Sequence, residues 1–191
     1  MPTPVEVIPV DEEIELCWPA MDDAEGLFAL IDANRDYLGR WLPWVDVIRR
    51  SEDERQWVER CLMHKVEGSG TPPLIIYRGQ VVGTIGTEGR IDPLNRACEV
   101  GYWVAEAYQG RGIVTRACRA LVEHLIGSLG LNRVVVRAQP DNWRSVAIPQ
   151  RLGFTYEGIQ RQAAYVGGQF HDLAIYAMLA QEWAALHNAA G

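Results

Sequence analysis

Apolar and polar positions along the chain follow two different periods, and the changes between them mark out strands and helices. Segments 13–20, 97–104 and 133–139 are rich in β-branched and aromatic residues, which is typical of strands. Between about Gly112 and Leu129, apolar residues recur at steps of three and four, which predicts a helix with one buried face. The chain therefore combines strands with helices.

Polar residues just ahead of apolar segments predict where two N-terminal helices begin. Asp22 or Asp23 is placed to cap a helix that runs to about Asp36. Ser51 is followed three residues later by Glu54, which is the spacing of a capping box for a second helix.

Glycine and proline positions complete the order of elements. Segment 74–92 has the pattern of a hairpin that turns at residues 78–80, and a closing hairpin is expected to turn at residues 167–168. A helix over about 142–152 is expected to bend near Pro149. The resulting order is strand, two helices, three strands, helix, strand, helix and two strands. This order predicts a mixed α/β sheet covered by helices, and it differs from a regular doubly wound array.

Length and composition bound the class of protein. The 191 residues suit a single domain spanning 1–191, and 48% hydrophobic with 23% charged residues is typical of soluble globular proteins. No apolar run is long enough to span a bilayer, and the segment MPTPVEVIPVDEE lacks the pattern of a signal peptide. We therefore expect a cytoplasmic protein without a membrane partner.

Net charge and the spacing of cysteines and histidines limit the classes of ligand and partner that the protein is expected to bind. The net charge of −7 argues against a general nucleic-acid binder, because phosphate contacts need a basic surface. Acidity is compatible with a cationic partner such as an amine or a basic peptide, and equally with a role in solubility alone. The four cysteines and four histidines lack metal-ligand spacing, so we expect packed free thiols and no metal site.

A glycine-bearing segment, YQGRGIVTRA at 108–117, joins strand 97–104 to the helix that begins near Gly112. At such a junction, unpaired backbone N–H groups and the positive end of the helix dipole point outward together. We therefore expect an anion to bind there. The dinucleotide motif G-x-G-x-x-G and the P-loop are both absent, so the anion belongs to another kind of ligand.

The segment QGRGIV at 109–114 resembles the Q/R-x-x-G-x-G/A pyrophosphate loop of the GNAT superfamily of acyl-CoA-dependent N-acyltransferases, with Val114 where the family has Gly or Ala. The segment DNWRSVAIPQRLGFTYEG at 141–158 resembles the N-x-x-S…LGF-x-x-EG signature of the branch that acetylates the N-termini of ribosomal proteins. ALIDANRDYLGRWLPWVD at 29–46 is similar to that branch as well. The resemblance extends from about Ile14 to Trp183.

The resemblance implies a mixed, mostly antiparallel central sheet with a splayed strand pair, flanked by helices. It also implies that acetyl-CoA is the co-substrate and lies in the cleft between the splayed strands. Backbone groups of Trp103 and Val104 would pair with the pantetheine amides, as an added strand does, and Asn142 would contact the coenzyme arm. The pyrophosphate would lie on the backbone amides of the glycine loop, namely Gln109, Gly110, Arg111, Gly112, Ile113, Val114 and Thr115.

Two residues are candidates for the chemistry of transfer. Glu99 begins the cleft strand, where family members place a general base, and it shares a strand face with Gly101 and Trp103; a salt-bridged carboxylate at a strand end is an equally good interpretation. Ser145 matches the serine that the branch is thought to use on the leaving thiolate; the alternative is a first-turn residue that satisfies helix donors. The branch also carries a glutamate on its penultimate strand at a position that is Ala164 here.

The acceptor site is predicted from aromatic and acidic residues. Trp41 and Trp44 flank Pro43 in a loop that can wall an amine site through cation–π contact, or they are core anchors. Tyr165 and Asp172 in the closing hairpin are further candidates for contacting the acceptor.

The predicted reaction is the direct attack of a primary amine, either a protein N-terminus or a small amine, on acetyl-CoA in a ternary complex. No cysteine is placed to form an acyl-enzyme. Two alternatives stay open: a non-catalytic acyl-CoA sensor or scaffold, and a transferase for another acyl group such as succinyl. The sequence leaves the oligomeric state, including a homodimer, open.

Overall fold

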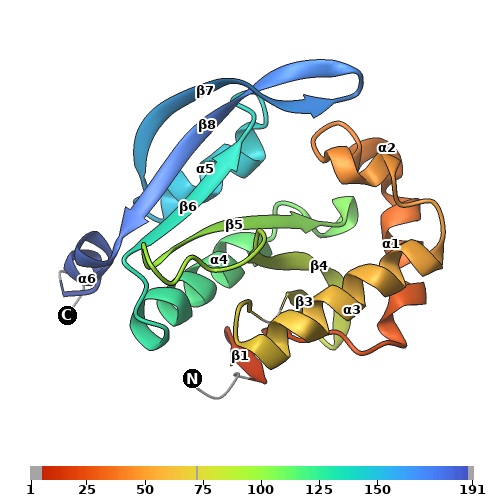
Figure 1. Cartoon of the computed structure of the whole chain (residues 1–191), viewed down its shortest axis with the longest axis horizontal. Coiled ribbons are helices and arrows are strands. Elements are labelled where there is room, and N and C mark those ends of the chain that lie inside the picture. Colours follow the sequence, from red (N-terminus) through yellow and green to blue (C-terminus); the bar gives the residue numbers. More distant parts are fainter. Residues whose placement is uncertain (1–5, 72, 189–191) are drawn as a thin grey trace.

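One eight-stranded sheet organises the computed structural model, which describes residues 6–71 and 73–188 (Figure 1). The strand order is β1-β2-β3-β4-β5-β6-β8-β7. The strands are β1 (Val7–Pro9), β2 (Ile14–Cys17), β3 (Leu74–Tyr77), β4 (Gln80–Thr87), β5 (Ala97–Val104), β6 (Arg133–Ala138), β7 (Thr155–Val166) and β8 (Gln169–Leu179). The helices are α1 (Asp23–Ala33), α2 (Arg35–Leu38), α3 (Ser51–Glu67), α4 (Ile113–Glu123), α5 (Trp143–Arg151) and α6 (Ala180–Asn188). Helical turns η1 (Pro43–Asp46), η2 (Glu106–Tyr108) and η3 (His124–Ser128) complete the described elements.

The sheet is splayed between β5 and β6. All other neighbouring strands are antiparallel, whereas β5 and β6 run parallel and pair only from Ala97 to Glu99 on β5. On its other side β5 stays paired with β4 up to Val104. The second half of β5 therefore offers one free backbone edge, and Figure 1 shows β5 and β6 diverging there. The predicted mixed, mostly antiparallel sheet with a splayed pair is confirmed.

Helices cover both faces of the sheet, and alternate side chains of β3 pack against the helices on opposite faces. Leu74 and Ile76 pack with α1 and α3, while Ile75 and Tyr77 belong to the core that contains α4. The stripe predicted for the long helix is confirmed over most of its length, since Val114, Cys118, Leu121 and Leu125 are at most 9% exposed, whereas Leu129 lies beyond η3 and is half-buried. None of the helices in the described residues is long and apolar enough to cross a membrane.

Both predicted hairpin turns are confirmed. Arg78 and Gly79 have φ of +50° and +78°, and Gly167 and Gly168 have +57° and +79°. Two successive positive values are typical of the two-residue turns whose twist suits a hairpin.

The predicted capping box is wrong. The N-cap of α3 is Arg50, and the Asp53 carboxylate accepts hydrogen bonds from the backbone N–H groups of Arg49 (2.9 Å) and Arg50 (3.1 Å). Glu54 lies one residue further along the helix and is buried. Because the helix begins one residue earlier than predicted, with Arg50 as its N-cap, Asp53 and not Glu54 occupies the third helical position and reaches back to the helix N-terminus.

Other boundaries also differ from the sequence prediction. The first helix ends at Ala33 instead of Asp36. Asp22 is its N-cap residue, as one of the two predicted candidates, but no side chain of the described residues caps the helix, and the Asp23 carboxylate accepts from Ala20 N at 2.7 Å. The aromatic loop contains the turn η1. The short strand β1 and the C-terminal helix α6 were not predicted, while α5 runs through Pro149 as one helix.

Candidate active site

The glycine loop presents an uncapped helix N-terminus. Gly110 and Gly112 each have φ of +71°, and an added Cβ would meet nothing within 4 Å at either position. Gly112 is the N-cap of α4, no side chain caps it, and the first turn contains no acidic residue. The leading N–H groups of α4 are therefore available to an anion, which is the geometry that the sequence predicted.

A first cavity of about 500 Å³ lies between this terminus, the free edge of β5 and the start of α5. Its lining includes every predicted coenzyme residue except Arg111: Trp103, Val104, Gln109, Gly110, Gly112, Ile113, Val114, Thr115 and Asn142. The Arg111 guanidinium instead donates to Ala107 O at 3.1 Å and lies over the Tyr108 ring. Ser145 and Trp41 also line this cavity.

Ser145 is fixed by a contact that crosses the cleft. The Tyr102 hydroxyl donates to Ser145 O at 3.0 Å, and Ser145 Oγ donates to the Tyr102 oxygen at 3.5 Å. Pro149, four residues after Ser145, has no N–H to offer that carbonyl, so the carbonyl can accept from Tyr102. Asn142 Oδ1 caps α5 by accepting from Ser145 N at 3.3 Å. Helix capping is thus done by Asn142, and the Ser145 hydroxyl faces the cavity with Tyr102.

Burial raises the pKa of Tyr102, and the nearby Cys118 adds a smaller rise. The hydrogen bond with Ser145 lowers the pKa, but by less than burial raises it. The phenol therefore keeps its proton across the physiological range. It can donate a hydrogen bond but cannot act as an anionic base.

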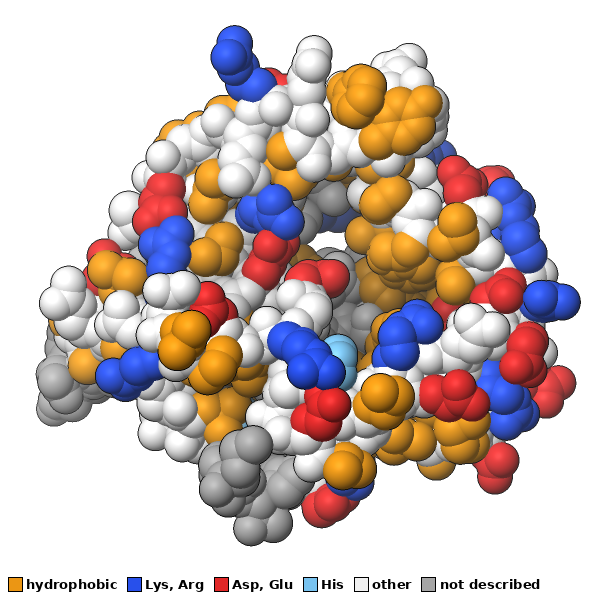
Figure 2. Space-filling view, viewed as in Figure 1, with side chains coloured by type: hydrophobic (Ala, Val, Ile, Leu, Met, Phe, Trp, Pro, Cys, Tyr) orange, Lys and Arg blue, Asp and Glu red, His pale blue; other side chains and the backbone are white. Residues whose placement is uncertain are grey.

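A second cavity of about 470 Å³ lies on the other side of β5. Leu42, Tyr102 and Trp103 line both cavities, so the two meet along the second half of β5. Four tryptophans contribute to the wall of the second cavity: Trp18, Trp44, Trp57 and Trp103. Figure 2 shows this face of the molecule hollowed at its centre, with acidic, basic and hydrophobic side chains and a histidine around the opening.

Two carboxylates and a hydroxyl line the second cavity. Glu54 is 4% exposed, and burial raises its pKa to about 7 despite the nearby Arg60 charge. Burial and the charge of Glu99 raise the pKa of Glu88, with Arg137 opposing. Thr71 Oγ1 is buried and has no hydrogen-bond partner among the described residues. The wall therefore offers polar groups that a bound ligand can satisfy.

Glu99 is ion-paired and does not line either cavity. Arg137 Nε donates to Glu99 Oε1 at 2.9 Å, and Arg137 Nη2 lies 2.8 Å from Glu99 Oε2. Arg137 also donates to Gln160 Oε1 at 3.0 Å. This is the salt-bridged arrangement that the sequence left open, and the role of Glu99 as a base stays a prediction.

The predicted acceptor residues are spread over three places. Trp44 lines the second cavity, with its ring centroid 6.2 Å from that of Trp103, whereas Trp41 lines the first. Tyr165 is 57% exposed and packs on Phe170, while Asp172 accepts from Gln162 N at 2.8 Å where β7 is bulged. The structure therefore brings neither Tyr165 nor Asp172 into the lining of these cavities.

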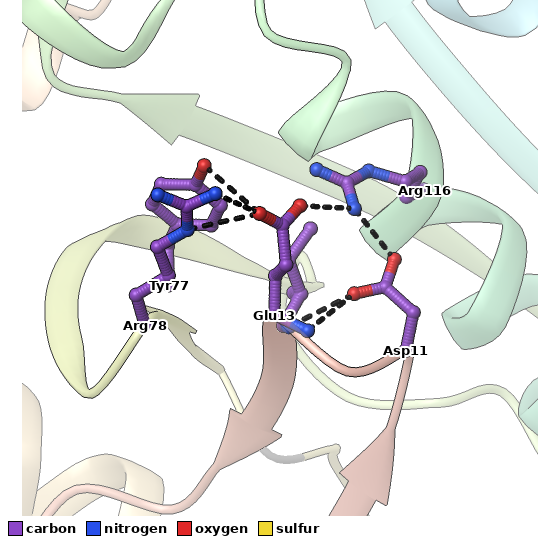
Figure 3. Close-up of polar contacts among 6 residues, drawn as sticks. Asp11, Glu13, Tyr77, Arg78 and Arg116 are labelled. Carbon is purple, nitrogen blue, oxygen red and sulfur yellow. Dashed lines mark hydrogen bonds and ion pairs between the residues drawn. The ribbon is translucent and has the colours of Figure 1, made fainter.

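A charged network holds α4 against the sheet edge (Figure 3). Arg116, in the first turns of α4, pairs with Asp11 at 2.8 Å and with Glu13 at 3.0 Å. Glu13 also accepts from Arg78, whose Nε is 2.9 Å away, and from the Tyr77 hydroxyl at 3.4 Å. The network joins the β1–β2 hairpin and the β3–β4 turn to the helix whose N-terminus faces the first cavity.

Sequence reasoning missed Tyr102, Glu88 and Thr71 as site residues and misassigned Glu54. Tyr102 was missed because nothing distinguishes it in the sequence from the other aromatic residue of its strand, and Glu54 was misassigned because it has the spacing of a capping box with Ser51. Glu88 follows β4 at a chain position without any motif, and only the β4–β5 pairing brings it to the cleft. Among the described residues, no group of three or more His, Cys, Asp or Glu side chains is placed to hold a metal ion.

Comparison with known proteins relates this geometry to one family. Residues 14–155 match the family model described as an acetyltransferase (GNAT) domain. The chain is 35% identical over 175 residues to YdaF of Bacillus subtilis (strain 168), covering 91% of this chain and 95% of that protein. It is 33% identical over 174 residues to the ribosomal-protein-serine acetyltransferase of Escherichia coli (strain K12), covering 91% and 97%.

A solved structure shows the same architecture. RimL, a ribosomal L7/L12 alpha-N-protein acetyltransferase in complex with coenzyme A, superposes with a TM-score of 0.88 at 30% identity. The match covers 93% of this chain and 99% of that one. The structural similarity therefore extends over nearly the whole of both chains.

Proposed function

The chain belongs to the GNAT family of acetyltransferases, and on that premise we propose that it acetylates the α-amine of a protein N-terminus. Membership gives the reaction class, which is acetyl-CoA-dependent N-acetylation. The proposal concerns the acceptor and the residues that carry the reaction.

The observation that carries the proposal is a pair of cavities that meet along one free strand edge. In the first, the uncapped N-terminus of α4 suits the pyrophosphate of acetyl-CoA, and the free edge of β5 at Trp103 and Val104 suits the pantetheine amides. This arrangement would direct the thioester toward Tyr102 and Trp103, where the second cavity begins.

The second cavity suits an acceptor amine. Its four tryptophans suit an ammonium group through cation–π contact, and the carboxylates of Glu54 and Glu88 share the lining with Arg60 and His64. Two relatives named for ribosomal-protein or L7/L12 N-acetylation support a protein N-terminus as the acceptor class. Bringing amine and thioester together in fixed geometry would supply much of the rate, since good orientation contributes roughly 7–11 kcal/mol.

We assign to the Tyr102–Ser145 pair the stabilisation of the leaving group, which is the thiolate of coenzyme A. As the C–S bond breaks, negative charge develops on sulfur, and a nearby hydroxyl can stabilise it by donating a hydrogen bond. Ser145 Oγ is our candidate donor, because it lines the first cavity and lies 3.5 Å from the Tyr102 oxygen across the cleft.

An acetylation panel tests the proposed acceptor. The enzyme and acetyl-CoA are incubated with purified L7/L12, purified uS5, spermine and kanamycin, and intact and peptide mass spectrometry locate the added acetyl group. We expect modification of the α-amine of a ribosomal protein. Transfer to spermine or kanamycin alone would assign a small-molecule acceptor, and coenzyme binding without transfer would support the scaffold alternative. A cytoplasmic location remains a prediction that cell fractionation tests, and size-exclusion chromatography measures the oligomeric state, which the sequence leaves open.

A further inference from the structure

An N-terminal amine is protonated near neutral pH, so transfer needs a group that removes a proton from it. The position where the resembled branch carries a glutamate is Ala164, which does not line either cavity. Glu99 is held by Arg137. We infer that Glu88 accepts the proton from the acceptor ammonium group and so generates the amine that attacks the thioester. This inference rests on the proposed function.

Register places Glu88 at the point where the sheet opens. Glu88 N donates to Glu99 O at 2.8 Å, which continues the β4–β5 pairing one residue beyond β4. The Glu88 carboxylate then lies over Gly101, occupying the space that a side chain there would fill. Gly101 is two residues past the last β5 residue that pairs with β6. A carboxylate at this position lines the second cavity beside Tyr102 and Trp103.

The carboxylate of Glu88 is available for proton transfer. Among the described residues it accepts no hydrogen bond and forms no ion pair, in contrast to Glu99. Glu88 is accessible to water, so it can release the proton to solvent after each turnover. Surrounding protein and the negative charge of Glu99 nevertheless raise its pKa, which strengthens it as a base, while Arg137 on β6 opposes the rise.

Glu54 is less suited to the same role. It lines the same cavity from α3, together with Arg60 and His64, but it is 4% exposed and so has no comparable route for returning protons to water. Gly101, which has no side chain, leaves space for the Glu88 carboxylate just past the last pairing of β5 with β6.

The step balances in protons and bonds. The ammonium group gives one proton to the Glu88 carboxylate, and the freed nitrogen lone pair forms a C–N bond with the thioester carbon. Collapse of the tetrahedral intermediate breaks the C–S bond. The thiolate takes the second proton that the nitrogen loses, and Glu88 returns the first proton to water. The products are the amide and the thiol of coenzyme A.

Steady-state kinetics with acetyl-CoA and the acceptor identified by the panel test this role. In Glu88→Gln we expect kcat to fall about 100-fold, because general base catalysis contributes at least that much in most enzymes. The KM for acetyl-CoA should change little, since the donor lies in the first cavity. The acid limb of the pH–rate profile should move upward toward about pH 8, because only the neutral α-amine then reacts.

Matched variants separate the possible results. Glu59→Gln removes an exposed charge from α3 and should behave as wild type, and circular dichroism melting confirms that each variant is folded. A Glu88→Gln enzyme with wild-type kcat and acid limb overturns the inference, as does an upward shift of the limb in Glu54→Gln or Glu99→Gln alone. If the wild type transfers acetyl to no acceptor, the proposed function itself fails.

Discussion

Tyr102 and Ser145 make the one side-chain contact that we assign to the departure of the thiolate. The Tyr102 hydroxyl uses its proton on the Ser145 carbonyl, which Pro149 leaves without a helical partner. Ser145 Oγ therefore keeps its own proton for the cavity or for the Tyr102 oxygen. A proline inside a helix, which the sequence indicates only as a bend, here provides a fixed acceptor for a cleft residue.

Replacing Ser145 by Ala should lower kcat by about 100-fold, the loss typical when one donor to a developing negative charge is removed. Affinity for acetyl-CoA should be almost unchanged, because the pyrophosphate and pantetheine contacts remain. Steady-state kinetics and calorimetry measure the two quantities. Ser128→Ala, at an exposed serine, is the control, and equal kcat in both variants would remove Ser145 from the mechanism.

Among the elements, the charged network around Arg116 connects two hairpins to α4, the helix whose N-terminus faces the first cavity. Hydrogen bonds from Arg78 and then Arg116 lower the pKa of Glu13. Burial raises the pKa of Asp11, but hydrogen bonds from the Glu13 backbone and from Arg116 outweigh it, so the net pKa is lowered. Both carboxylates therefore stabilise the fold above their ordinary pKa range and lose that stabilisation as the pH falls.

Replacing Arg116 by Gln should consequently lower Tm at pH 7 and reduce the further loss of Tm between roughly pH 5 and pH 3. Thermal melts of the coenzyme-free protein across this range measure both effects. Arg55→Gln is the matched control, because Glu52, at 3.5 Å on an exposed helix face, is the one ion-pair partner of Arg55 among the described residues. Parallel acid profiles for wild type and Arg116→Gln would contradict the account.

The sequence predicted most elements but only part of what positions the site. Periodicity predicted α4, and glycine positions between strand patterns predicted both hairpin turns, because each of these features is specified by residues close together in the chain. The short strand β1 was missed because three residues carry little periodicity. Glu88 was missed because its place over Gly101 depends on the pairing of β4 with β5, and local sequence does not determine that register.

In the whole molecule, two cavities meet along the second half of β5, and we propose that one holds the acetyl donor and the other the acceptor. The first cavity is lined by the glycine loop and by Asn142, the N-cap of α5. The second is lined by the carboxylates of Glu54 and Glu88 and by four tryptophans. Predicted donor residues were largely brought together because they lie in two contiguous motifs. Predicted acceptor residues were dispersed, since the second cavity is assembled from segments far apart in the chain, including α3 and the β4–β5 connection.

The proposed function requires the N-terminus of α4 to hold the pyrophosphate of acetyl-CoA. Calorimetric titration of the wild type with acetyl-CoA, coenzyme A and ATP tests it, alongside Gly112→Asp, which puts a negative charge at that terminus. Gly79→Asp is the control, because Gly79 also has a positive φ with open space around it but lies in the β3–β4 turn. We predict saturable binding of acetyl-CoA and coenzyme A but not of ATP, retained in Gly79→Asp and abolished in Gly112→Asp. Unchanged affinity in Gly112→Asp would contradict the account.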